Sequence, residues 1–300
     1  MAASRTVFTV QDTNDLFNKV AGKSSLAKLS GQKPMSFNGN NIFTFSFDNE
    51  ASIVAENGAK VHGGVTAASV KVVPIKFEYG ARVSDEFLYG SDEVGLQILE
   101  QFKEGAAKKF ARGFDIAAMH GYNPYSKTAS VVVGTNNLDY GITTEATYSA
   151  LAPDAALSTV VASLIGADKE VTGIALAPAY ANALGTYKVS GIAQYPEFAF
   201  GAAPQSFAGH AVDVNSTVST IVADGDPYYG YVGDFENAFR WGFGKDISLE
   251  VIEYGNPDNS DAGDLKGHNQ VYLRCEAYIG WGILDYASFG RIDSADPASV

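Results

Sequence analysis

The sequence predicts an α+β fold, with strand-rich segments toward both ends, one long helix and a central region that mixes helices with strands. Apolar residues recur at three- and four-residue steps over 92–119, which is the spacing of one face of an α-helix. Apolar and polar residues alternate over 43–47, 73–83 and 271–281, as expected of half-buried strands. Two further helical segments enclose a short apolar strand at 173–177, which gives the mixed region in the middle of the chain.

The beginning of the chain predicts one short helix and one strand. A broken apolar stripe over 12–29 indicates the helix, which Asp12 or Thr13 can cap at its N-terminus. Pro34 lies beyond the end of this helix. The strand follows at 43–47, where three phenylalanines alternate with threonine and serine.

Residues 48–83 have the character of a long hairpin with a loose tip. Asn-Gly at 57–58 and Gly-Gly at 63–64 are strong turn formers because both pairs accept positive φ. A strand follows over 73–83, but Pro74 cannot donate to a ladder, so this strand is expected at a sheet edge or in a free-standing arm. The apolar face of the strand includes Ile75, Phe77 and Tyr79. Nothing in the hairpin covers that face, so the sequence predicts cover from another subunit.

The longest helix is expected over 92–119. Ser91 can cap it, and Asp92 and Glu93 lie in the first turn, where the helix dipole favours acidic side chains. Gly121 ends it. Basic residues lie mostly off its apolar stripe, at Lys103, Lys108, Lys109 and Arg112. A solvated helix face explains them better than contact with nucleic acid.

The middle of the chain predicts a helix–strand–helix unit. Pro153 opens one helix and Pro178 lies in the first turn of the next, where a missing N–H costs nothing. Further short strands are expected around 211–214, 219–222 and 229–232. The chain then returns in strands at 247–251 and 271–281, separated by a polar loop over 256–269, and these strands have only the long helix left to pack on.

Composition excludes several classes of protein. The chain has 300 residues and a formal net charge of −13, which disfavours direct binding of nucleic acid because such binding neutralises phosphates with Lys and Arg. No stretch approaches the roughly 20 apolar residues of a membrane span, and the N-terminus lacks the apolar run of a secretory signal. The single cysteine, Cys275, excludes an internal disulfide framework, suits a reducing compartment and is expected to be a core residue.

The motifs of common active sites are incomplete. Gly22-Lys23-Ser24 could belong to a phosphate loop, but Phe17 occupies the position of the required first glycine. There is no G-x-S-x-G nucleophile elbow. The four histidines have no ligand spacing; they are His62, His120, His210 and His268. The acidic cluster of Asp258, Asp261 and Asp264 does not fit an EF-hand and is better explained as a solvated loop. We therefore expect no catalytic residue, no cofactor and no metal site, and expect that the chain is not an enzyme.

Six segments in this order carry a resemblance to a known family. They lie at 51–56, 73–88, 177–178, 207–212, 233–235 and 274–278. Together with the order of predicted elements, they resemble the Hong Kong 97-type major capsid fold of tailed bacteriophages, over nearly the whole chain.

The resemblance implies a division of the chain into five parts. These are an N-terminal arm at 1–47, an extended loop formed by a β-hairpin at 48–83, a peripheral domain with the spine helix at 84–150, a central α/β axial domain at 151–240, and strands at 241–300 that return to the peripheral domain.

The resemblance also implies a function and partners. Members of the family assemble as hexamers and pentamers into an icosahedral shell around double-stranded DNA, and each extended loop lies over a neighbouring subunit. Candidate subunit-interface residues are then Lys60, Pro74, Ile75, Phe77, Tyr79 and Arg82. Met1 falls just before the arm, so we expect a separate scaffolding protein, together with a portal protein and DNA packaged without sequence specificity. We expect no membrane partner, assembly in the host cytoplasm and a final location in the virion. Lys60 has no matching asparagine context, so a cross-link is not expected.

Two other hypotheses stay open at this point. One is an encapsulin-like compartment with the same fold, whose shell holds enzyme cargo instead of DNA. The other is a soluble enzyme with a polar pocket in 151–240. Under the capsid hypothesis, Phe77→Asp is expected to block assembly while leaving the core of the subunit folded.

Overall fold

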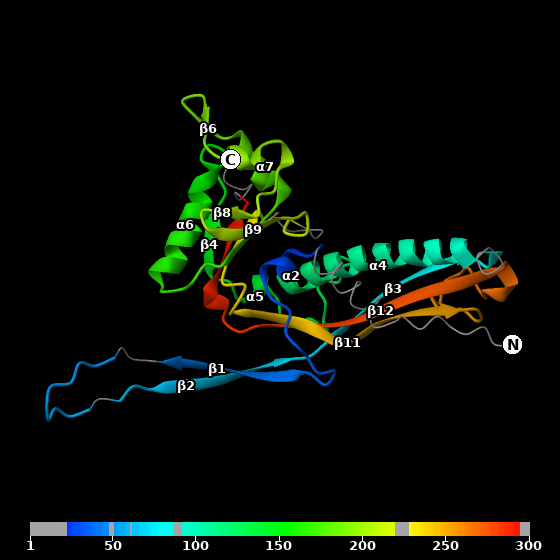
Figure 1. Cartoon of the computed structure of the whole chain (residues 1–300), viewed down its shortest axis with the longest axis horizontal. Helices are drawn as coiled ribbons and strands as arrows, with labels where there is room; N and C mark the ends of the chain where they lie inside the picture. Colours follow the sequence, from blue (N-terminus) through cyan, green and yellow to red (C-terminus); the bar gives the residue numbers. More distant parts are fainter. Residues whose placement is uncertain (1–22, 48–50, 61, 87–91, 220–227, 295–300) are drawn as a thin grey trace.

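The computed structural model describes residues 23–47, 51–60, 62–86, 92–219 and 228–294. It contains a sheet packed on a long helix, a second sheet with its own helices, and a hairpin that projects away from both (Figure 1). The predicted mixture of helices and strands is confirmed. In the described part of the chain, none of the helices is both long and apolar enough to cross a bilayer.

The long helix α4 (Asp92–His120) packs on an antiparallel three-stranded sheet. The strand order is β11 (Phe239–Ile252), β12 (Gln270–Ile283) and β3 (Ile75–Ser84). The apolar stripe of α4 faces this sheet, and every residue from 113 to 120 is buried, because the last turns of the helix also meet the second sheet. The expected long helix and its packing on the C-terminal strands are confirmed.

The second sheet has six strands. Their order is β4 (Thr144–Thr147), β13 (Phe289–Asp293), β10 (Gly230–Gly233), β5 (Gly173–Leu176), β9 (His210–Val214) and β8 (Ser206–Phe207). The central strand β5 is buried at all four residues, and the helices α6 (Pro153–Gly166) and α7 (Pro178–Thr186) both begin at a proline. The predicted helix–strand–helix unit is therefore confirmed.

Shorter elements complete the described chain. They are the helices α2 (Ser25–Leu29) and α5 (Leu138–Gly141), the strands β6 (Lys188–Val189) and β7 (Ile192–Ala193), and the 3-10 turns η1 (Pro196–Gly201), η2 (Lys266–His268) and η3 (Tyr286–Ser288). Of the helix expected over 12–29, residues 12–22 lie outside the described residues and 25–29 form α2. The strand expected at 219–222 lies outside the described residues apart from position 219.

The projecting hairpin consists of β1 (Asn40–Phe47) and β2 (Val65–Val72), which are paired along their whole length (Figure 1). The expected returning strand at 73–83 is not part of it, because residues 75–84 form β3 and pair with β12. Pro74 lies at the point where the chain leaves one sheet and joins the other. A residue without an N–H interrupts a ladder, so the hairpin ends before Pro74 and begins earlier than the sequence predicted.

Candidate assembly surface

The hairpin carries an apolar face that the described part of the chain leaves open. Phe43 and Phe45 on β1 are 66% and 62% exposed, and they lie opposite Ser69 and Ala67 on β2. Residues opposite one another in a pair of strands share a face, so the two rings stand together on one side of the ribbon. A two-stranded ribbon is marginally stable alone in water. Phe43 and Phe45, called here the aromatic face of the hairpin, are therefore suited to contact with another molecule.

Lys60 and Pro74 lie at opposite ends of the hairpin. Lys60 is exposed in the connection between β1 and β2, as expected of a residue near the tip. Pro74 is half-buried at the base, separated from the end of β2 by Val73. Neither position contradicts a role in subunit contacts.

Ile75, Phe77 and Tyr79 do not form the exposed stripe that the sequence suggested. All three are partly buried against the core of the same subunit. The Phe77 ring lies 6.3 Å from the Trp281 ring, and the Tyr79 ring lies 5.8 Å from Phe102 of α4. The reason is the pairing of β3 with β12, which turns this apolar face toward the long helix. The expectation that the stripe is exposed is wrong.

Arg82 is also occupied within the subunit. Its guanidinium donates to both carboxylate oxygens of Asp258, at 2.8 and 2.6 Å, and to the Asn256 side chain at 2.7 Å. It donates as well to the Gly263 carbonyl at 2.9 Å. The hydrogen bonds from Arg82 hold the pKa of Asp258 well below its ordinary value. Arg82 therefore fixes the polar loop between β11 and β12. Its hydrogen bonds account for the position and the charge of the Asp258 carboxylate.

A buried carboxylate joins the N-terminal segment to the long helix. Asp115 of α4 accepts hydrogen bonds from the Ser24 hydroxyl, from the Ser25 N–H at 2.9 Å and from the Thr217 hydroxyl at 2.8 Å. The Leu26 N–H also points at it, at 3.3 Å. Burial raises the pKa of Asp115 to about 6, against the opposite effect of these donors. The sequence analysis missed this residue, although a lone acid among apolar neighbours at 114–118 was a usable signal.

A second buried polar cluster lies at the end of α4 and resembles part of a catalytic site. His120 places Nδ1 2.9 Å from Asp139 Oδ2 and Nε2 2.9 Å from the Thr217 carbonyl oxygen. The Tyr231 hydroxyl donates to Asp139 at 2.6 Å, and burial raises the pKa of Tyr231. Both ring nitrogens of His120 are thus engaged inside the protein, so neither is free to act on a substrate. The cluster holds α4, α5 and β10 together.

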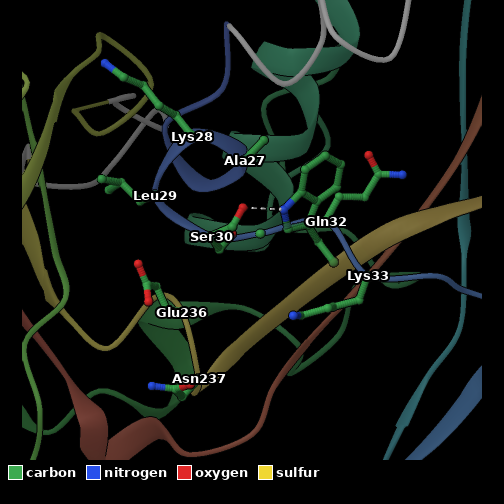
Figure 2. Close-up of a pocket in the computed structure, with 10 residues that line it drawn as sticks. Ala27, Lys28, Leu29, Ser30, Gln32, Lys33, Glu236 and Asn237 are labelled. Carbon is green, nitrogen blue, oxygen red and sulfur yellow. Dashed lines mark hydrogen bonds between the residues drawn. The ribbon is translucent and has the colours of Figure 1, made fainter. Parts of the chain in front are cut away.

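Two hollows were candidates for the pocket of an enzyme. Figure 2 shows one of about 470 Å³, between the N-terminal segment and the start of β11, where the Trp241 indole donates to the Ser30 carbonyl at 3.1 Å. Lys28, Lys33 and Glu236 are its charged lining residues, and Lys28 is already paired with Asp213 at 2.6 Å. The other lies beside α6, in the region expected for an enzyme pocket, and its lining is mostly apolar, including Leu157, Val161 and Phe207. The hollow beside α6 therefore lacks the convergent polar groups that the enzyme hypothesis requires in this region.

Comparison with known proteins identifies the family. The model of the phage capsid family matches residues 8–293. A solved structure from Mycobacterium phage Ogopogo is similar with a TM-score of 0.78 and 28% identity, covering 91% of this chain and 92% of that one. One from Gordonia phage Cozz has a TM-score of 0.74 and 26% identity, covering 91% and 87%.

More distant structures share the fold alone. The capsid of an empty GTA particle is similar with a TM-score of 0.64 and 16% identity, covering 91% of this chain and 90% of that one. None of the curated proteins compared with the chain matches it. These similarities confirm the predicted Hong Kong 97-type fold and favour a phage capsid over a compartment shell. Because the family's model spans nearly the whole chain, this protein belongs to the phage capsid family and is a structural subunit of a phage capsid.

Proposed function

We propose that copies of this chain assemble as hexamers and pentamers into an icosahedral shell around double-stranded DNA, with the hairpin of each copy lying over a neighbouring copy. The aromatic face of the hairpin carries this proposal, because Phe43 and Phe45 are exposed and no described residue of the same subunit covers them. Fully burying a phenylalanine side chain stabilises a contact by about 1.5–3 kcal/mol. A neighbouring copy supplies this cover at every position in a shell.

The form of the contact supports closed rings. The hairpin of one copy meets a different surface on the next copy, so the contact is head-to-tail and not self-complementary. Head-to-tail contacts close into rings when the rotation between copies permits it. Rings of six and five copies are the units that the proposed shell requires.

The remaining partners follow from the family resemblance and the charge of the chain. We include a scaffolding protein, a portal protein and DNA contacted without sequence specificity, with assembly in the host cytoplasm and a final location in the virion. The net charge of −13 supports weak contact with DNA, because an acidic protein has few cations to place against phosphates.

The decisive experiment replaces one ring of the aromatic face. Phe45→Asp places a charge where a neighbour is proposed to lie, and we expect the subunit to remain folded but to form no closed shells. Thr66→Asp is the matched control, since Thr66 lies opposite Ser46 on the other face of the same ribbon. Electron microscopy and sedimentation of wild type and both variants, with the scaffolding protein supplied if required, measure assembly.

Circular dichroism of the same samples measures folding. Shells of normal yield from Phe45→Asp would contradict the proposed role of the hairpin. A wild-type chain that stays monomeric under all salt conditions and with a scaffolding partner would contradict shell assembly altogether.

A further inference from the structure

The sheet beneath the hairpin has two very different faces. At 241–244 of β11 and 279–283 of β12, large side chains alternate with glycine. Trp241 and Trp281 are paired and buried on the side of α4, where the Phe114 ring lies 5.4 and 5.6 Å from them. The opposite face, called here the glycine seat, consists of Gly242, Gly244, Gly280 and Gly282. Glycine is disfavoured in strands and marks places where another part of the chain approaches closely.

At the base of the hairpin, the segments that enter it and leave it both lie on the glycine seat. Before the hairpin, a Cβ added to Gly242 would overlap the Lys33 carbonyl, and one added to Gly280 would overlap the Met35 sulfur. After the hairpin, a Cβ on Gly244 would lie 2.5 Å from Pro74 Cγ. A Cβ on Gly282 would overlap a methyl group of Val72, which is fully buried. At each of the four glycines, the base of the hairpin lies too close to the sheet to leave room for a Cβ. These contacts therefore hold the base of the hairpin against the sheet, as a clamp.

This clamp links the hairpin to the sheet that packs on α4. The sheet is packed on α4 by both tryptophans, and the segment before the hairpin is also tied to it by the hydrogen bond from Lys33 N–H to the Trp241 carbonyl, at 2.9 Å. Because the segments before and after the hairpin are both held on this sheet, the hairpin projects from the subunit in one direction. Without the seat, the same ribbon would pivot at its base.

We infer that the glycine seat positions the hairpin, setting the direction in which it leaves each copy and so the angle at which copies meet. The inference rests on the proposed function, because the direction matters only if the hairpin contacts a neighbour. It assigns to Gly242, Gly244, Gly280 and Gly282 a role in assembly beyond the folding of their own sheet.

A pair of compensating substitutions tests the seat. Gly282→Ala introduces a Cβ that meets the Val72 methyl, so the hairpin base must lift. We expect the yield of closed shells to fall by about tenfold, which a loss of about 1.4 kcal/mol per contact would produce. Val72→Ala removes the opposing methyl, so the double variant Val72→Ala/Gly282→Ala should recover most of the shells. Gly267→Ala is the control, since no atom lies within 4 Å of a Cβ there.

A distance measurement reports on the hairpin without depending on assembly. Cys275 is buried, so spin labels attach to cysteines introduced at two exposed positions, Ser69 on β2 and Lys108 on α4. Dipolar spectroscopy should give a narrow distance distribution in wild type, a shifted or broadened one in Gly282→Ala, and the narrow one again in the double variant. If Gly282→Ala fails to fold, Gly280→Ala with and without Met35→Ala replaces it, since the Met35 sulfur is the atom that a Cβ at Gly280 would approach most closely.

The outcomes separate this inference from the proposed function. Normal shells and an unchanged distance in Gly282→Ala, while Phe45→Asp still blocks assembly, would overturn the seat and leave the hairpin contact intact. A folded single variant that Val72→Ala does not rescue would also overturn it. Failure of the wild-type chain to assemble would instead overturn the proposed function, while the distance measurement would still decide whether the seat orients the hairpin.

Discussion

At the scale of single residues, Asp115 makes the stability of the subunit depend on pH. The carboxylate is fully buried, and burial raises its pKa to about 6, above the roughly 3.9 of an aspartate in an unfolded chain. The folded state therefore holds this proton more tightly than the unfolded state does. Its contribution to stability is fully present below the unfolded pKa and is lost as the pH rises through about 6.

We predict that Asp115→Asn removes this pH dependence, because an amide cannot ionise but still accepts hydrogen bonds from the N-terminal segment. Relative to the variant, wild type should gain about 1 kcal/mol in the free energy of unfolding as the pH falls from about 7 to about 5. Urea unfolding of both subunits at several pH values measures the difference. Burial also raises the pKa of Asp293 to about 6, but Asp293 titrates in both proteins, so its effect cancels in the difference between them. Parallel curves for the two proteins would show that Asp115 does not titrate in this range.

At the scale of elements, β1 and β3 carry similar sequence patterns but have different surroundings. Phe45 on β1 is open to solvent, whereas Phe77 on β3 packs on Trp281 and against Gly113 of α4. The consequence of a substitution thus depends on which strand it falls in. Phe77→Asp would disturb the subunit itself, so it is unsuited to testing assembly.

We predict that Phe77→Ala lowers the free energy of unfolding of the subunit by about 3 kcal/mol, since it empties a packed site beside the long helix. Phe45→Ala should change the free energy of unfolding by no more than about 0.5 kcal/mol, because an exposed ring makes few contacts within the subunit. Urea unfolding of unassembled subunits measures both changes. Equal losses in the two variants would show that the hairpin is packed on its own subunit, contrary to the structure.

The same pair of strands shows how far the sequence can be interpreted. The spacing of apolar residues and the positions of prolines were sufficient to predict α4, α6 and α7, because helices depend on neighbours three and four residues away. The burial of Cys275 also follows from local alternation, and burial raises the pKa of its thiol to about 12. The bounds of the hairpin do not follow, because β3 is placed by its pairing with β12, almost two hundred residues later in the chain. The contacts of Arg82 within the subunit do not follow either, for the same reason, because its partners at 256–263 are distant in sequence.

At the scale of the whole molecule, the subunit carries an excess of acidic charge that bears on its proposed contact with DNA. With 34 acidic and 21 basic side chains, the subunit repels a polyanion at a distance. Packaged DNA would then meet a wall to which it does not adhere strongly. This is useful for a container that must take in its contents without fixing them to the wall.

We predict that the free subunit binds duplex DNA weakly at physiological salt and that any binding at low salt falls steeply as salt is added, since phosphate contacts release counterions. Fluorescence anisotropy with a labelled duplex of arbitrary sequence, at two salt concentrations, measures this. Tight binding that does not depend on salt would contradict the idea of a non-adhesive wall.

The alternation of tryptophan and glycine along β11 and β12 has a consequence for the register of the two strands. A one-residue slip of either strand would turn its tryptophan, Trp241 or Trp281, toward the base of the hairpin and its glycines toward α4, since side chains alternate between faces. The slipped sheet would lose its core on one side and have no room for the hairpin on the other. Both faces therefore specify the same register independently, and a copy with mispaired strands would also be unable to extend its hairpin in the right direction.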